Sequence, residues 1–157
     1  MNKIEELAAI LLEQHLTMGT AESCTGGRIA NRITSCAGSS AYFKGGIVSY
    51  CNEVKHRVLG VSADDLITYG AVSQPVVEQM ARGAMRVLNC DCAVATSGIA
   101  GPGGAVPGKP VGTVWIAAAY KDKVNSQCFH FSSDRIGNIE LSAEAALNML
   151  GELIAPK

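Results

Sequence analysis

The sequence predicts an α/β protein: a three-layer α/β/α sandwich with a mixed, about five-stranded sheet, formed by one domain of residues 1–157. Short strand-like stretches alternate with amphipathic helical stretches, as in proteins whose sheet is covered by helices on both faces. The last two strand-like stretches are joined only by the polar turn "KDK", which indicates an antiparallel hairpin. With 48% hydrophobic and 17% charged residues, the chain is globular and can bury a substantial core.

The spacing of apolar residues and the positions of glycine and cap residues predict the first helices and the first strand. Apolar residues recur at helical intervals over residues 3–16, and Gly19 provides a stop for that helix. A very short strand is expected at 20–22. A second helix is expected over 23–34, with Ser23 or Thr25 as its cap.

The remaining elements alternate in the same way. A strand is expected over 42–50, where Gly45 and Gly46 indicate a bulge or a close backbone approach. Serines at cap positions open two of the helices that follow, and the three helices are expected at 52–59, 62–70 and 73–88. Further strands are expected at 90–98, 111–120 and 124–132, with a final helix at 135–153.

Composition argues against several classes of function. The formal net charge is −1 and no basic stripe is present, so nucleic acid is not an expected partner. Apolar runs stay well short of the roughly 18 residues of a membrane span, and glutamates interrupt the N-terminal apolar pattern, so we expect no membrane association, no secretion signal and a cytoplasmic location. The six cysteines lack a C-x-x-C pair, so we expect reduced thiols and no metal site.

Polar segments follow three of the predicted strands: "ESCTGG", "SYCNEVK" and "TSGIAGPGG". Ligands of open α/β sheets bind beyond the carboxyl ends of strands. Convergence of these three segments at one rim of the sheet would make a binding site.

Ser23 is the candidate nucleophile, because a strand-to-helix turn presents a hydroxyl beside free backbone N–H groups. The alternative is a helix cap, which is the more common role of a serine at such a turn. A serine needs a base, and none of the three histidines lies in a serine-hydrolase motif. Lys55, near Tyr50, is the other route to a base, although spacing alone would also fit a solvated helix charge. Cys24 points about 100° away from Ser23 on a helix and is expected to pack beneath it.

The segment "GGAVPGKP" resembles a P-loop, but Pro110 follows Lys109 where that motif needs serine or threonine and a helix. A phosphoryl-transfer protein and a dinucleotide-binding fingerprint are therefore not supported. The glycines can hold the backbone close to a ligand phosphate or ring, or the segment can be a plain loop.

Several long segments together resemble the CinA C-terminal domain family, the nicotinamide mononucleotide deamidases. The matching segments are "AESCTGGRIANRIT", "GSSAYFKGGIVSYCNEVKHRVLGV", "GAVSQPVVEQMARGA", "SGIAGPGGAVPGKPVGTVWIA" and "FSSDR". They cover nearly the whole chain in order, and the chain resembles the stand-alone form of the family. The resemblance implies the same sandwich fold. It also implies hydrolysis of the ring carboxamide of nicotinamide mononucleotide to nicotinate mononucleotide and ammonia, without metal or cofactor, in pyridine nucleotide (NAD) salvage.

The resemblance assigns the catalytic roles to Ser23, Tyr50 and Lys55. Neutral Lys55 would accept the Ser23 proton directly or through Tyr50, and Lys55 or Tyr50 would protonate the leaving nitrogen. Backbone N–H groups of Thr25, Gly26 and Gly27 would hold the oxyanion. The remaining candidates, for the substrate's ribose and phosphate, are Ser39, Ser40, Ser97, Gly98, Gly101, Gly103, Gly104 and Arg135.

The chain departs from the family pattern in three segments. Ser97 replaces a threonine, and Cys36 and Ala37 replace a Val-Pro-like pair, a change we expect to be structural. After Arg135, a second arginine is replaced by "IE" at 139–140, which predicts weaker binding of the nucleotide. The alternative to an amidase is a nucleotide-binding partner module of the same fold with little or no turnover. The apolar strand "VWIAAAY" suits a dimer interface as well as a core, and we expect a dimer rather than a monomer.

Overall fold

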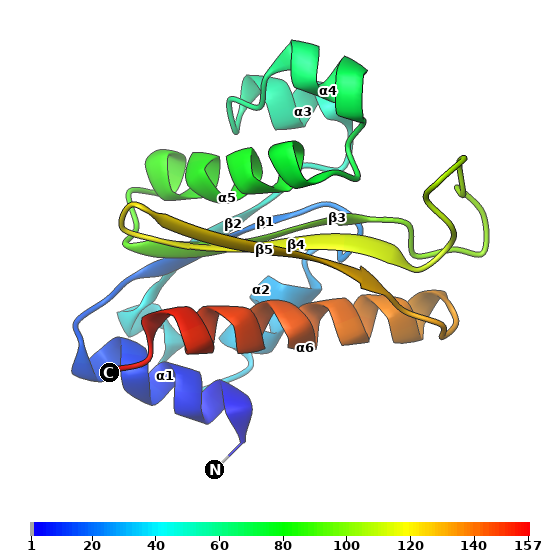
Figure 1. The fold of residues 1–157 in the computed structure, drawn as a ribbon. Helices are drawn as coiled ribbons and strands as arrows, with labels where there is room; N and C mark the ends of the chain where they lie inside the picture. Colours follow the sequence, from blue (N-terminus) through cyan, green and yellow to red (C-terminus); the bar gives the residue numbers. More distant parts are fainter. Residues whose placement is uncertain (1) are drawn as a thin grey trace.

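A five-stranded mixed sheet forms the centre of the computed structural model, which describes residues 2–157 (Figure 1). Its strands are β1 (Met18–Glu22), β2 (Phe43–Val48), β3 (Cys92–Gly98), β4 (Thr113–Tyr120) and β5 (Lys123–His130). The order across the sheet is β2-β1-β3-β4-β5. Strand β1 is parallel to both of its neighbours, whereas β4 is antiparallel to β3 and to β5. The predicted mixed sheet and the terminal hairpin are both confirmed.

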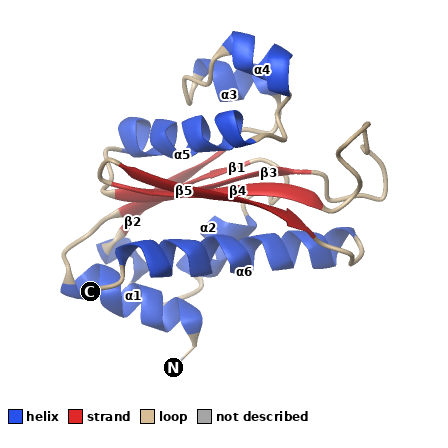
Figure 2. Cartoon of the chain, viewed as in Figure 1, coloured by secondary structure: helices blue, strands red, loops and turns tan. Residues whose placement is uncertain are grey.

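Helices cover both faces of this sheet (Figure 2). One layer contains α1 (Lys3–Glu13), α2 (Arg28–Thr34) and α6 (Arg135–Ile154). The other contains α3 (Asn52–Arg57), α4 (Ala63–Tyr69) and α5 (Gln74–Leu88). Each layer has its own apolar cluster against the sheet, centred on residues such as Leu11 and Ile116 on one face and Val77 and Met80 on the other. None of the helices described is long and apolar enough to cross a membrane.

Strand β1 is longer than the three residues predicted, and all five of its residues are buried. The prediction placed Gly19 at the end of the first helix, but α1 ends at Glu13 and Gly19 lies inside β1. A Cβ at Gly19 would lie 2.5 Å from Leu88 Cδ1, so close packing against α5 explains the glycine. Gly19 therefore marks a close contact between the sheet and α5, and not the end of a helix.

The predicted helix start at Ser23 is wrong, because α2 begins at Arg28 and residues 23–27 form a turn. Gly26 and Gly27 adopt φ values of +57° and +102°, which hold the chain out of the helix before Arg28. The N-cap position is Gly27, which has no side chain, so neither Ser23 nor Thr25 caps α2. This turn leaves the Ser23 side chain free for another partner.

Glu22 takes over the capping of α2 from the end of β1. Its side chain is buried, and its two carboxylate oxygens accept the N–H groups of Ile29 at 2.9 Å and Ala30 at 3.1 Å. These are the second and third residues of the helix, whose donors an N-cap side chain normally satisfies. The Thr25 hydroxyl donates to the same carboxylate at 2.6 Å, so three donors stabilise this buried charge.

Strand β2 contains the irregularity that its two glycines predicted. Its register against β1 shifts between Met18 and Gly19, and Gly45 has a φ of +155°. A Cβ at Gly46 would overlap the Thr20 hydroxyl of β1. Both a bulge and a close approach are therefore present, and they bring the ends of β1 and β2 into line.

Helix α5 packs directly on the segment that follows α3. A Cβ at Gly83 would overlap the carbonyl oxygen of Leu59, which also accepts a hydrogen bond from Arg86 Nη2 at 3.0 Å. We expect Gly83→Ala to destabilise the protein by about 1–3 kcal/mol, because backbone atoms must move to admit the methyl group. Urea unfolding followed by circular dichroism measures this.

The matched control is Gly151→Ala in α6, where an added Cβ meets nothing within 4 Å. That change should be neutral or stabilising by up to about 1 kcal/mol, because alanine favours a helix over glycine. Equal stabilities of the two variants would contradict the close packing of α5 on Leu59.

Candidate active site

A cavity of about 300 Å³ lies where β1, β2 and β3 end together. Ser23 and Cys24 follow β1, the segment from Tyr50 to Lys55 follows β2, and Ser97 with the glycine-rich loop ends β3. Ala71 and Val72, between α4 and α5, and Arg135, the first residue of α6, complete the lining. The structure therefore brings the three polar segments of the sequence to one rim, as the topology of parallel strands requires.

Lys55 extends from the short helix α3 into this cavity and is almost completely buried, with 1% of its surface exposed. Its Nζ lies 3.0 Å from Ser23 Oγ, 2.7 Å from the carbonyl oxygen of Ser49 and 3.5 Å from that of Tyr50. Burial lowers the pKa of this amine from its ordinary value of 10.5, against smaller opposite effects of nearby cysteines. The alternative that Lys55 is a solvated helix charge is wrong.

These three contacts also satisfy a neutral lysine. A neutral amine has two N–H donors and one lone pair, and two carbonyl oxygens are in place to accept those donors. The lone pair then points to the remaining partner, so the Ser23 hydroxyl can donate its proton to Nζ. The site therefore accommodates the deprotonated form that a general base requires.

Ser23 is held by its backbone as well as by its side chain. Its N–H donates to the carbonyl oxygen of Thr96 at 3.1 Å, and its own carbonyl accepts the N–H of Gly26 at 3.1 Å. The N–H of Gly26 is thus already engaged. Thr25, Gly26 and Gly27 all lie outside the cavity lining, so the expected oxyanion donors are adjacent to the site and do not line it.

Cys24 lines the cavity next to Ser23 but has the chemistry of a core residue. It is buried among apolar side chains of the α2 and α6 layer, as expected. Burial raises the pKa of its thiol to about 11, so the nucleophilic thiolate is disfavoured. All six cysteines are free, and residues 2–157 contain no cluster of three or more metal-ligating side chains.

Tyr50 and Arg135 meet across the mouth of the cavity. The Tyr50 side chain is 62% exposed, and its hydroxyl accepts a hydrogen bond from Arg135 Nη2 at 3.3 Å. Arg135 Nη1 donates to the carbonyl oxygen of Gly101 at 2.8 Å. The structure thus places the Tyr50 phenol beside Arg135, while only its backbone carbonyl approaches Lys55.

The glycine-rich loop forms the opposite wall, with Gly98, Gly101, Gly103 and Gly104 all lining the cavity. A Cβ at Gly98 would lie 2.6 Å from Val114 Cγ2, and Gly101 adopts a φ of +87°, so the wall requires glycine at these two positions. The buried side chain of Asn138 in α6 donates from Nδ2 to the carbonyl oxygen of Ala100 at 3.0 Å and so anchors the loop. Sequence reasoning missed Asn138, because one asparagine in a helical pattern carries no distinctive signal.

Ser97 contributes a hydroxyl that the protein leaves unused. It is 1% exposed and lines the cavity, and its Oγ has no hydrogen-bond partner among the residues described. A buried hydroxyl normally has a partner, so this one is available to a ligand.

Ser39 and Ser40 lie away from the cavity, in the single turn η1 (Ser39–Ala41) that precedes β2. Because β2 is parallel to β1, with Phe43 opposite Met18, this turn is at the amino ends of the strands and Ser23 is at the carboxyl end. A sequence motif gives no spatial distances, so it could not show that Ser39 and Ser40 lie at the opposite end of the sheet from Ser23. Glu140, in the segment where the family resemblance implies a second arginine, forms ion pairs with Arg28 and Arg32 of α2.

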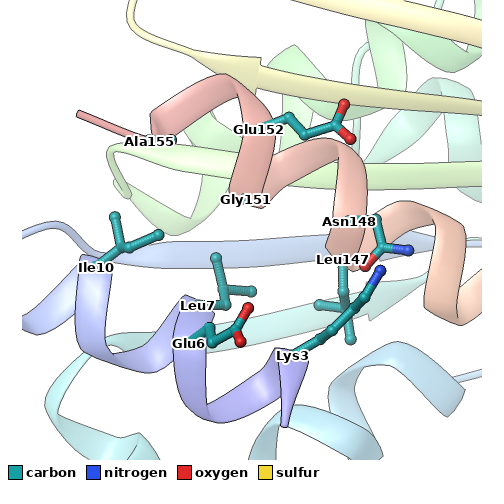
Figure 3. Close-up of a pocket in the computed structure, with 9 residues that line it drawn as sticks. All are labelled: Lys3, Glu6, Leu7, Ile10, Leu147, Asn148, Gly151, Glu152 and Ala155. Atoms are coloured by element: carbon teal, nitrogen blue, oxygen red, sulfur yellow. The ribbon is translucent and has the colours of Figure 1, made fainter. Parts of the chain in front are cut away.

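A second hollow of about 260 Å³ lies between α1 and α6 (Figure 3). Apolar side chains such as Leu7, Ile10 and Leu147 line it together with charged groups at its edge. It contains no serine, cysteine or histidine. The cavity at the carboxyl ends of the strands is the candidate active site, because it contains the contact between Ser23 and the buried Lys55.

Comparison with known proteins gives the same family along the whole chain. Residues 2–154 match the model of the CinA C-terminal domain. A CinA-like protein of Chloroherpeton thalassium is 46% identical over 154 residues, which are 96% of this chain and 37% of that protein. A CinA-like protein of Shewanella sp. strain W3-18-1 is 50% identical over 155 residues, or 96% of this chain and 36% of its own. The chain thus spans little more than a third of the length of these curated relatives.

Solved structures match over nearly their full length. A competence-damaged protein (CinA) superfamily protein from Klebsiella pneumoniae superposes with a TM-score of 0.93 at 34% identity and covers 99% of both chains. A competence/damage inducible protein from Agrobacterium tumefaciens has a TM-score of 0.84 at 41% identity, covering 99% of this chain and 96% of its own. By sequence and by fold, the chain belongs to the CinA C-terminal domain family.

Proposed function

We propose that this chain is a nicotinamide-nucleotide amidase, which hydrolyses the carboxamide of nicotinamide mononucleotide to nicotinate mononucleotide and ammonia in pyridine nucleotide salvage. The observation that carries the proposal is the 3.0 Å contact between Ser23 Oγ and the buried Lys55 Nζ inside a cavity. A serine paired with a lysine of lowered pKa is a nucleophile with its base, the arrangement that acyl transfer requires.

In the first half of the reaction, neutral Lys55 accepts the Ser23 proton while Oγ attacks the carboxamide carbon. The 3.0 Å distance supports direct transfer, without Tyr50 as an intermediary. The tetrahedral intermediate collapses when its nitrogen receives the proton from Lys55, and ammonia leaves. The product of this half is an ester between Ser23 and the nicotinoyl group of the nucleotide.

In the second half, water attacks that ester and Lys55 accepts the proton of the water molecule. Collapse of this second intermediate returns the proton from Lys55 to Ser23 Oγ and releases the carboxylic acid, which ionises in water. Each step moves one proton to or from Lys55, so the chemistry proposed here is completed by the protein's own groups and water.

The walls of the cavity fit a mononucleotide. Arg135 offers a guanidinium at the mouth for the phosphate, and the ion pairs of the described residues do not include it. Ser97 offers an unused hydroxyl inside, and the glycine-rich loop allows close approach of backbone to the ribose. A volume of about 300 Å³ lies at the lower end of the range of small-molecule sites.

The second candidate is a nucleotide-binding module of the same fold that has little turnover. Tyr50 favours it, since its hydroxyl contacts Arg135 and not the Ser23–Lys55 pair. Glu140 favours it too, since it replaces a cation with an anion beyond Arg135. The intact Ser23–Lys55 contact favours the enzyme.

Replacing the nucleophile tests the reaction directly. Ser23→Ala should lower kcat at least about 1,000-fold, because the covalent step is lost. Cys24→Ala, one residue away, should retain most of the activity, because its thiol is protonated and packs in the core. The assay measures ammonia and nicotinate mononucleotide released from nicotinamide mononucleotide. Full activity in Ser23→Ala would rule out the covalent mechanism, and an inactive parent protein would rule out this substrate.

The role of the base is tested by Lys55→Arg, which keeps the charge but cannot become neutral at ordinary pH. We expect kcat to fall by at least about 100-fold, because general-base catalysis typically contributes that much. Lys55→Arg with the parent's kcat would show that the lysine acts only as a fixed positive charge.

The pH dependence follows from the lowered pKa of Lys55. Burial favours the neutral amine, so kcat/KM should rise with pH through an apparent pKa below 10.5 and level off above it. As pH falls through that pKa the amine becomes protonated and the rate should decline. Tyr50→Phe is the control, because a rise that persists in that variant belongs to the lysine and not to the phenol. A flat profile up to pH 10.5 would contradict this assignment.

A further inference from the structure

Two groups at the cavity mouth are coupled in a way that the Ser23–Lys55 pair does not use. The guanidinium of Arg135 donates two hydrogen bonds, one to the Gly101 carbonyl oxygen at 2.8 Å and one to the Tyr50 hydroxyl at 3.3 Å. The shorter bond fixes Arg135 to the glycine-rich loop. The longer bond holds Tyr50 and is the weaker of the two.

The backbones on both sides of this contact are fixed. The Tyr50 carbonyl faces Lys55 Nζ, and Asn138, one turn after Arg135, binds the carbonyl oxygen of Ala100. The Tyr50 side chain itself is 62% exposed and Arg135 is also exposed. The contact can therefore be exchanged by side-chain rotation alone, without movement of a helix or strand.

A phosphate is a better partner for this guanidinium than a phenol is. It is charged, and it accepts two parallel N–H bonds from the planar fork of an arginine. The salt bridges of the described residues leave Arg135 without a carboxylate partner, so its charge is available. A phosphate arriving at the mouth would displace the Tyr50 hydroxyl from Nη2.

We propose that Arg135 couples phosphate recognition to the release of Tyr50: the substrate's phosphate takes the guanidinium, and the freed phenol turns to hydrogen-bond the substrate bound beside Ser23. This inference rests on the proposed amidase function and adds a specificity mechanism to it. In this mechanism the phosphate of the substrate contributes to binding and also increases the rate of amide hydrolysis. It also gives the exposed phenol a role that its present position leaves open.

The test separates the phosphate from the rest of the substrate. Hydrolysis is measured with nicotinamide mononucleotide, with nicotinamide riboside, and with the riboside plus phosphite, a small dianion. We expect the mononucleotide to have the highest kcat/KM, by about 10- to 150-fold over the riboside, the range for a hydrogen bond to a charged group. Phosphite should raise the rate on the riboside, because it can occupy Arg135 and release Tyr50.

Variants then test the coupling. Phosphite activation should be lost in Arg135→Ala, in Tyr50→Phe and in the double variant, with non-additive effects because the two side chains act as one unit. Arg135→Lys should retain part of the activation, since a point charge cannot form the bidentate contact. The control Arg82→Ala removes an arginine that binds the Asp122 carbonyl at the distant β4–β5 turn, and it should keep full activation.

Kinetic constants distinguish coupling from simple anchoring. Tyr50→Phe should lower kcat for the mononucleotide more than it raises KM. Full phosphite activation in Tyr50→Phe, or none in the parent protein while the mononucleotide is hydrolysed, would overturn the coupling and leave the amidase function standing. Failure of the parent protein to hydrolyse the mononucleotide would overturn the proposed function and this inference with it.

Discussion

The buried carboxylate of Glu22 is the constraint on which the site depends. It lies at the end of β1, forms no salt bridge among residues 2–157, and is stabilised by two N–H groups of α2 and the Thr25 hydroxyl. The Thr25 hydroxyl also lies 2.8 Å from that of Thr96 in β3. The Thr25 hydroxyl has one hydrogen and donates it to Glu22, so the Thr96 hydroxyl must be the donor to Thr25. These hydrogen bonds form a chain that connects β1, α2 and β3. The turn that carries Ser23 is enclosed by this network. In a Glu22→Gln variant, the side-chain NH2 group would face a backbone N–H group of α2, and two donors cannot form a hydrogen bond. Only a carboxylate therefore accepts all three hydrogen bonds.

A second buried group completes the arrangement from the opposite layer of helices. Lys55 comes from α3, whereas Ser23 belongs to the turn before α2, so the pair bridges the two faces of the sheet. Leaving a lysine in this position costs stability, because burial penalises its charged form. Carbonyl oxygens of Ser49 and Tyr50 compensate for the lost water without fixing the protonation state. The same burial that costs folding stability lowers the pKa of Lys55 and so favours the neutral amine that a general base requires.

Much of this could be predicted from the sequence, and the failures have definite causes. Hydrophobic periodicity predicted the sandwich, the polar turn "KDK" predicted the hairpin, and Gly45 and Gly46 predicted the irregularity in β2, because these features depend on local sequence. The start of α2 was missed because its cap comes from Glu22, outside the helix, and two glycines with positive φ separate them. Parallel topology explains why three polar segments meet, and it equally explains why Ser39 and Ser40 do not join them. The direction of the Tyr50 side chain depends on Arg135, 85 residues away, and no local rule reaches that far.

The residues that line the cavity come from two groups of chain segments. The Ser23–Lys55 pair is built by the segments after β1 and β2, whereas the loop after β3 and the first turn of α6 form the facing wall, held together by Asn138 and Arg135. The two halves have separate backbone anchors and meet where Arg135 Nη2 contacts the Tyr50 hydroxyl, so substitutions away from that contact need not disturb the Ser23–Lys55 geometry. A lineage could therefore vary the glycine-rich loop around Gly103 and so change the shape of the ligand wall, while the Ser23–Lys55 contact stays in place. An engineer could follow the same route.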